Sequence, residues 1–206
     1  MRPTIPDPVY SEALRFTLNW ECRGLADELL LSEGRNRHPG ALVDDPDDPG
    51  GRTAYGITQA TYNADRRDRG LPPRDVWLVE AQEVVDIYFQ RYWGRLAKYL
   101  PTKLAMAVFD TSVLHGVPYA TQRLQDVLKL KVDGIVGQSM MGAIEQLWGQ
   151  PVNGITQDFL QQRDDRYEEL IDRNRRLAKF YAGWERRCDD LCDFVGVERT
   201  FDRAAA

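Results

Sequence analysis

A glutamate at the end of a helix and an acidic, turn-rich segment are the two features of this sequence that could do chemistry together. Glu21 closes an apolar helical pattern, and the run Asp44 to Gly51 contains four aspartates, two prolines and two glycines. Proline and glycine restrict the backbone of such a turn, so its side chains can be held in one place. A carboxylic acid paired with a second carboxylate or a held water molecule can act as a general acid and base. The sequence therefore predicts a polar site at these two segments.

The acid has to be protonated near neutral pH, which partial burial of a carboxyl group favours. Trp20 and the apolar helix give Glu21 such surroundings. Asp48 is the leading candidate for the second carboxylate, because the Pro-Gly-Gly that follows it fixes its position. Thr53 could hold the attacking water. For Asp45 a structural role in an Asx-turn is the better interpretation.

Three further residues are candidates for substrate binding. Tyr55 and Trp93 could form the aromatic walls of a cleft, because aromatic rings offer flat apolar faces. Tyr92 and Trp93 are equally well explained as core residues, since aromatic residues at helical spacing often pack inside. Asp110 follows Phe109 on the most apolar helix, where a buried carboxylate needs a partner. A hydrogen bond that pins this helix is at least as good an interpretation as contact with a substrate.

The elements that must position these residues are predicted to be helices. Apolar residues recur at helical spacing over 8–33, 76–99 and 159–195, with Gly24 as a possible interruption of the first segment. The helix predicted from Thr102, ended by Gly116, is apolar on nearly every side, which indicates a central position. Residues 36–58 are a loop by composition. The fold class is therefore mainly α around one central apolar helix, with at most a small hairpin in the acidic loop.

Composition narrows the class of protein further. With 206 residues, 43% of them apolar, the chain can bury one sizeable core or two small ones that share an interface. The net charge of −5 argues against a protein that neutralises nucleic-acid phosphates. The three cysteines, Cys22, Cys188 and Cys192, fit no zinc spacing with two histidines, and buried free thiols are the better interpretation. No spacing in the chain suggests a cofactor or a metal.

Four segments of the chain carry a resemblance to a known family. They are Ala13-Leu14-x-Phe16-x-Leu18-x-Trp20-Glu21, Asp45-Pro46-x-Asp48-Pro49-Gly50-Gly51-x-Thr53-x-Tyr55-Gly56-Ile57-Thr58, Ile87-Tyr88-x-x-x-Tyr92-Trp93 and Val108-Phe109-Asp110. In this order they resemble the glycoside hydrolase family 108 lysozymes, which are phage and bacterial N-acetylmuramidases. The stretch from Leu124 to Leu147, with the turn Asp133 to Gly137, resembles the peptidoglycan-binding region assigned to the second half of these enzymes.

The resemblance implies a lysozyme-like helical globule with a catalytic region over 1–99 and a helical, peptidoglycan-binding-like region over 100–206, packed as one compact unit. It also implies an endolysin-like activity on bacterial peptidoglycan. The bond cleaved would be the β-1,4 bond between N-acetylmuramic acid and N-acetylglucosamine. A direct binding role for the Asp133 to Gly137 turn is the weaker interpretation, since a glycine turn between two helices needs only left-handed backbone angles.

In this family the glutamate that opens a Glu-Gly-Gly triplet is the catalytic acid. Glu21 matches the residues upstream of the triplet, but Cys22 and Arg23 replace its two glycines. Glu33, followed by Gly34, is the alternative acid, although its upstream residues match less well. We favour Glu21. The insertion 25–41 could be a lid, a partner-docking helix or a neutral extension.

The sequence leaves two alternative functions open. A lytic transglycosylase also uses one glutamate, and a non-catalytic wall-binding or phage structural module is the alternative outside the enzymes.

The N-terminus has no apolar run of signal-peptide length, and no segment approaches the ~20 apolar residues of a membrane span. We therefore expect synthesis in the cytoplasm without a signal peptide and no membrane insertion. Action on the cell wall would then require a holin or another export route.

Overall fold

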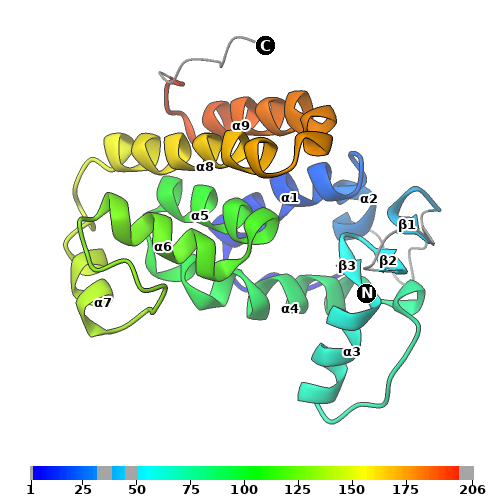
Figure 1. Ribbon diagram of the computed structural model, residues 1–206. Helices are drawn as coiled ribbons and strands as arrows, with labels where there is room; N and C mark the ends of the chain where they lie inside the picture. Colours follow the sequence, from blue (N-terminus) through cyan, green and yellow to red (C-terminus); the bar gives the residue numbers. More distant parts are fainter. Residues whose placement is uncertain (1, 32–38, 45–50, 200–206) are drawn as a thin grey trace. The chain divides into compact units, whose positions relative to one another are not determined.

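The computed structural model describes residues 2–31, 39–44 and 51–199 and is mainly helical with one small sheet, as predicted (Figure 1). The predicted residue Asp48 and the alternative acid Glu33 lie outside the described residues. The chain divides into two compact units, Met1–Gly94 and Arg95–Ala206. The packing of its two regions as one compact unit stays a prediction. No helix among the described residues is long and apolar enough to cross a bilayer.

The first unit combines helices with a short three-stranded antiparallel sheet in the order β1-β2-β3. Its elements are α1 (Pro8–Glu21), α2 (Ala26–Leu31), η1 (Pro39–Ala41), β1 (Leu42–Val43), β2 (Thr53–Ala54), β3 (Ile57–Thr58), α3 (Gln59–Asp68), η2 (Val76–Leu78) and α4 (Ala81–Arg91), followed by η3 (Trp93–Arg95). Asp7 begins α1 by accepting hydrogen bonds from the N–H groups of Val9 and Tyr10. Gly24 interrupts the first helical segment, because Arg23 and Gly24 both have positive φ values, 54° and 85°.

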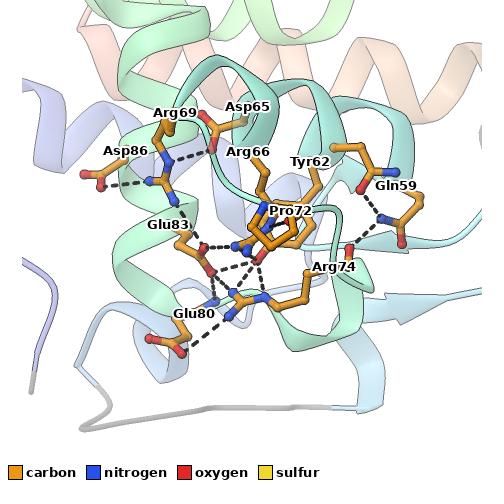
Figure 2. Close-up of polar contacts among 11 residues, drawn as sticks. Gln59, Tyr62, Asp65, Arg66, Arg69, Pro72, Arg74, Glu80, Glu83 and Asp86 are labelled. Carbon is orange, nitrogen blue, oxygen red and sulfur yellow. Dashed lines mark hydrogen bonds and ion pairs between the residues drawn. The ribbon is translucent and has the colours of Figure 1, made fainter.

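A partly buried ionic network joins α3, the loop after it and α4 (Figure 2). Glu83 Oε1 accepts hydrogen bonds from Arg66 at 3.1 Å and Arg69 at 3.3 Å, and Oε2 accepts one from the Tyr62 hydroxyl at 2.9 Å. Arg74 also donates to Glu83. Because one carboxylate meets three guanidinium groups, this network fixes the 62–83 segment beside the small sheet.

The second unit is built around α5 (Thr102–His115), the central helix that the sequence predicted. Every residue of α5 from Leu104 to Ser112 is buried, and α5 packs against α6, α8 and α9. The other elements of this unit are η4 (Ala97–Tyr99), α6 (Val117–Val127), α7 (Gln138–Glu145), α8 (Asn153–Arg173), η5 (Arg175–Phe180) and α9 (Tyr181–Val195).

Two long helices that the sequence predicted are divided in the structure. The segment 76–99 forms η2, α4, η3 and η4, because Glu80 and Glu83 build a capping box that starts α4 afresh. The segment 159–195 is interrupted at Asn174, which has an extended backbone and accepts a hydrogen bond from the Arg176 N–H at 3.2 Å. In both places side-chain oxygens bind backbone N–H groups, so a helix can begin where the apolar pattern alone shows no boundary.

An ion-pair triad lies in the core of the second unit. Asp110 on α5 is 1% exposed. Its Oδ2 accepts a hydrogen bond from Arg163 on α8 at 2.7 Å, and its Oδ1 accepts one from Arg187 on α9 at 2.8 Å. Burial opposes the ionisation of Asp110, but the charges of Arg187 and Arg163 outweigh it and lower the pKa of this carboxyl well below its usual range. The triad therefore fastens three helices to one another.

Replacing Asp110 with asparagine should destabilise the second unit, because it leaves two buried guanidinium groups without their carboxylate. We expect Asp110→Asn to lower the free energy of unfolding by about 3–5 kcal/mol, measured by urea denaturation at neutral pH. Since the folded-state pKa is depressed, the contribution of Asp110 is present above its unfolded pKa of about 4 and is lost as the pH falls below it. The difference between native protein and variant should therefore shrink in acid. Exposed Asp158→Asn is the control, and an equal loss in both variants would contradict a structural triad.

Candidate active site at the end of helix α1

Glu21 is the last residue of α1 and is half-buried against the turn between β2 and β3. A Cβ atom added to Gly56 would lie 3.1 Å from Glu21 Cβ and 3.3 Å from Glu21 Oε2. The same atom would lie 2.7 Å from the Tyr88 hydroxyl on α4. Only glycine allows the turn backbone to approach this closely, so Gly56 brings α1, the hairpin and α4 together around the Glu21 carboxylate.

The turn at Gly56 is a tight two-residue hairpin connection. Tyr55 and Gly56 both have positive φ values, 51° and 73°, as a type I′ turn requires. A tyrosine rarely adopts this conformation. The Tyr55 N–H donates to Ala41 O at 3.0 Å, and Tyr55 O accepts a hydrogen bond from the Tyr88 hydroxyl at 2.9 Å. These bonds and the burial of the Tyr55 ring hold the turn against Glu21.

The charge of Glu21 acts on a nearby phenol and on the thiol that follows it in the chain. Burial and the nearby charge of Glu21 raise the pKa of the half-buried Tyr92, with Arg91 acting in the opposite direction. Burial and the charge of Glu21 also raise the pKa of Cys22 to about 12, so this thiol is protonated. The Tyr88 and Tyr92 rings lie 5.7 Å apart between centroids. The site therefore combines one helix-end carboxylate with the phenol of Tyr92, because the single hydroxyl proton of Tyr88 is already donated to Tyr55 O.

Arg52 follows the acidic turn, and its side chain binds both the start of that turn and the segment before η2. It donates to Asp44 Oδ2 at 3.0 Å and to Asp75 Oδ2 at 2.8 Å, and its guanidinium lies 4.5 Å from the centroid of the Trp77 ring. Thr53, the next residue, is half-buried in β2 and is paired with Val43 and Thr58. The hairpin that carries Thr53 thus continues into the turn beside Glu21. The roles of Asp48 and Thr53 stay predictions.

The three predicted substrate-binding residues have little surface in this structure. Tyr55 is 1% exposed, and Trp93 is 2% exposed with its ring centroid 5.4 Å from that of Tyr10. Asp110 lies in the second unit, and both of its carboxylate oxygens are engaged by arginines. This geometry matches the alternatives of a core tryptophan and a helix-pinning aspartate, and contact of these residues with substrate stays a prediction.

Tyr88 is the residue at this site to which the sequence analysis gave no role. It lies within the segment Ile87-Tyr88-x-x-x-Tyr92-Trp93, where spacing places Tyr88 and Tyr92 on the same face of one helix. Aromatic residues at this spacing are typical of a core, and Tyr88 is indeed 1% exposed. Tyr88 acts at the site through its hydroxyl, which donates a hydrogen bond to Tyr55, 33 residues earlier in the chain.

Comparison with known proteins places these features in a class. Residues 27–116 match the family model described as Glycosyl hydrolase 108, and residues 119–189 match the Predicted Peptidoglycan domain. Together the two matches support a glycoside hydrolase that acts on peptidoglycan. The match over 27–116 is to the family that the resemblance named, which confirms the resemblance. No curated protein matches the chain.

One solved structure shares the fold over nearly the whole chain. It is described as the structure of Brucella abortus SagA, with a TM-score of 0.67 and 21% sequence identity. The match covers 93% of this chain and 96% of that one. At this identity the similarity concerns the fold alone.

Substituting Gly56 tests whether the turn has to approach Glu21 closely. Gly56→Ala places a methyl group against Tyr88 and Glu21 in addition to the left-handed strain of about 1–2 kcal/mol. We expect it to destabilise the first unit and to lower peptidoglycan hydrolysis at least tenfold, a loss of about 1.4 kcal/mol in transition-state stabilisation. Thermal unfolding and turbidity assays measure the two effects.

Gly70→Ala is the matched control for this substitution. Gly70 has a similar φ of 69°, but a Cβ there would meet no atom within 4 Å. It therefore carries the backbone strain without the contact. Equal activity of the Gly56 and Gly70 variants would show that the close approach has no catalytic importance.

Proposed function

We propose that this protein is a muramidase that cleaves the β-1,4 bond between N-acetylmuramic acid and N-acetylglucosamine, with Glu21 as the general acid. The observation that carries the proposal is the position of Glu21. It lies at the end of α1, against the Gly56 turn and near two tyrosines, within a chain whose family acts on glycosidic bonds.

The chemistry requires one proton donor and one means of supplying water. Glu21 gives its proton to the glycosidic oxygen, so the sugar with the new hydroxyl group can leave as the bond to the anomeric carbon breaks. Positive charge develops on the remaining sugar ring and is stabilised by the Asp48 carboxylate, which we assign to this role. A water molecule held by Thr53 then adds its hydroxide part to the anomeric carbon. The proton that this water loses passes to the Glu21 carboxylate, which restores the general acid for the next cycle.

Glu33 is the alternative proton donor. The family match begins at residue 27 and so includes Glu33 but not Glu21. Glu33 lies outside the described residues, so what supports Glu21 is its own surroundings, where the hairpin and Tyr88 close around it. Single substitutions of each glutamate decide between them.

Glu21→Gln should abolish hydrolysis and leave folding intact, because glutamine keeps the size of the side chain and cannot donate a proton as an acid. We expect activity at least a thousandfold lower, a loss of about 4 kcal/mol, in reducing-end release and turbidity loss on purified peptidoglycan. Glu33→Gln, prepared and tested in parallel, should keep most of the activity.

The other outcomes of this comparison are equally informative. An active Glu21→Gln with an inactive Glu33→Gln would move the acid to Glu33. Activity in both variants would rule out the proposed mechanism. Binding to sacculi by the native protein without any release of reducing ends, across several wall types, would instead support a non-catalytic wall-binding module.

The products distinguish hydrolysis from transglycosylation. A lytic transglycosylase forms an intramolecular anhydro bond, so its muropeptides lack the water that a muramidase adds. Mass spectrometry of the released fragments therefore separates the two reactions. As for its location, we propose that the protein acts on the cell wall after release through a holin or another export route.

A further inference from the structure

A pocket of about 340 Å³ lies in the second unit, where the chain passes from α6 to α7. Its walls come from the loop after α6 and from the first turn of α7, including Leu130, Lys131, Asp133, Ile135, Ser139 and Met140. The pocket lies within residues 119–189, which match the peptidoglycan domain. No residue of the candidate active site lines it.

One buried side chain fixes the shape of this pocket. Gln125 on α6 is 3% exposed, and its Oε1 accepts hydrogen bonds from the N–H groups of Asp133 at 3.0 Å and Gly134 at 2.8 Å. Its Nε2 donates to Asp133 Oδ1 at 2.9 Å and to Ile135 O at 3.0 Å. The side-chain amide of Gln125 thus makes four hydrogen bonds, two accepted and two donated, which hold the loop in place. A ligand that enters such a preformed pocket does not have to order the loop.

The side chains of the pocket present both signs of charge next to apolar surface. Lys131 is 86% exposed, and its Nζ lies 3.5 Å from Asp133 Oδ2. Asp133 stays ionised, because hydrogen bonds from the Ile135 N–H and the Gln125 amide lower its pKa. Ile135 is 65% exposed, and Met140 is buried at 2% exposure. A hydroxyl group is available from Ser139.

This lining fits a peptide better than a sugar. None of the residues that line the pocket is aromatic, so it offers no flat ring on which a sugar could stack. A short peptide with free carboxylate and amino groups instead matches a lysine, an aspartate, a hydroxyl group and an apolar wall. Peptidoglycan carries such a peptide on its N-acetylmuramic acid residues.

We propose that this pocket binds the peptide stem of peptidoglycan, with a stem carboxylate at Lys131, an amino group at Asp133 and the aliphatic part of the stem against Ile135 and Met140. The inference rests on the proposed function for the identity of the substrate. The further claim is that the second unit binds the peptide, whereas the first unit acts on the glycan strand.

A titration of the full-length Glu21→Gln protein tests this inference. One arm uses a soluble stem tetrapeptide with free carboxylate and amino groups, and the other uses a peptide-free oligomer of the glycan. The NMR signals of the Ile135 and Met140 methyl groups report binding. We expect the tetrapeptide, and not the glycan oligomer, to shift both signals in a saturable manner.

A charge reversal in the pocket provides the second readout. Lys131→Glu should weaken tetrapeptide binding roughly tenfold or more, because a carboxylate of the ligand would meet a carboxylate of the protein. Lys179→Glu, an exposed lysine on η5 outside the pocket, is the matched control and should bind as before. Signal shifts with the glycan oligomer alone, or equal binding by the two charge-reversal variants, would overturn the proposal.

The two proposals can fail separately. The tetrapeptide contains no glycosidic bond, so its binding does not depend on hydrolysis. Peptide binding by a protein that releases no reducing ends would overturn the muramidase and leave this inference standing. Hydrolysis by a protein that does not bind the tetrapeptide would do the reverse.

Discussion

The close approach of the Tyr55–Gly56 turn to the end of α1 is the contact on which the candidate site depends. Two successive residues have left-handed backbone angles, and one of them is a tyrosine. Such a conformation costs about 1–2 kcal/mol for a residue with a side chain. The hydrogen bond from Tyr88 and the burial of the Tyr55 ring offset this cost. The turn, α1 and α4 are therefore held as one arrangement, and the carboxylate of Glu21 lies where they meet.

Each unit also contains an ionic cluster in which arginines outnumber the acid that they share. Glu83 meets three arginines in the first unit, and Asp110 meets two in the second. Charges as buried as Asp110 and Arg163 are retained only with well-oriented partners, since desolvation would otherwise favour their neutral forms. The Asp110 cluster joins helices that are far apart in the sequence, whereas the Glu83 cluster joins α4 to α3 and to the loop that precedes α4. They restrict the relative positions of helices within each unit more strongly than apolar packing would, because apolar contacts have no preferred direction.

The sequence was sufficient for the features that depend on local pattern and insufficient for those that depend on distant partners. Apolar spacing predicted the mainly helical fold and the central helix, and Gly24 indicated the end of the first helix. The boundary at Asn174 was missed because a single capping side chain outweighed a continuous apolar pattern. Tyr88 was missed because its hydroxyl acts on a remote turn, and periodicity only marks its ring as buried. The pairing of Asp110 with Arg163 and Arg187 likewise required three helices to be assembled.

Cys22 gives the candidate site a property that concerns oxidation rather than proton transfer. The thiol follows Glu21 directly in the chain, is 1% exposed and is held in its protonated form. Oxidants, alkylating agents and soft metal ions react with the exposed thiolate and only slowly with a shielded, neutral thiol. The buried Cys22 sulfur thus behaves as an apolar packing atom. The geometry around Glu21 should consequently be the same in a reducing and in an oxidising compartment.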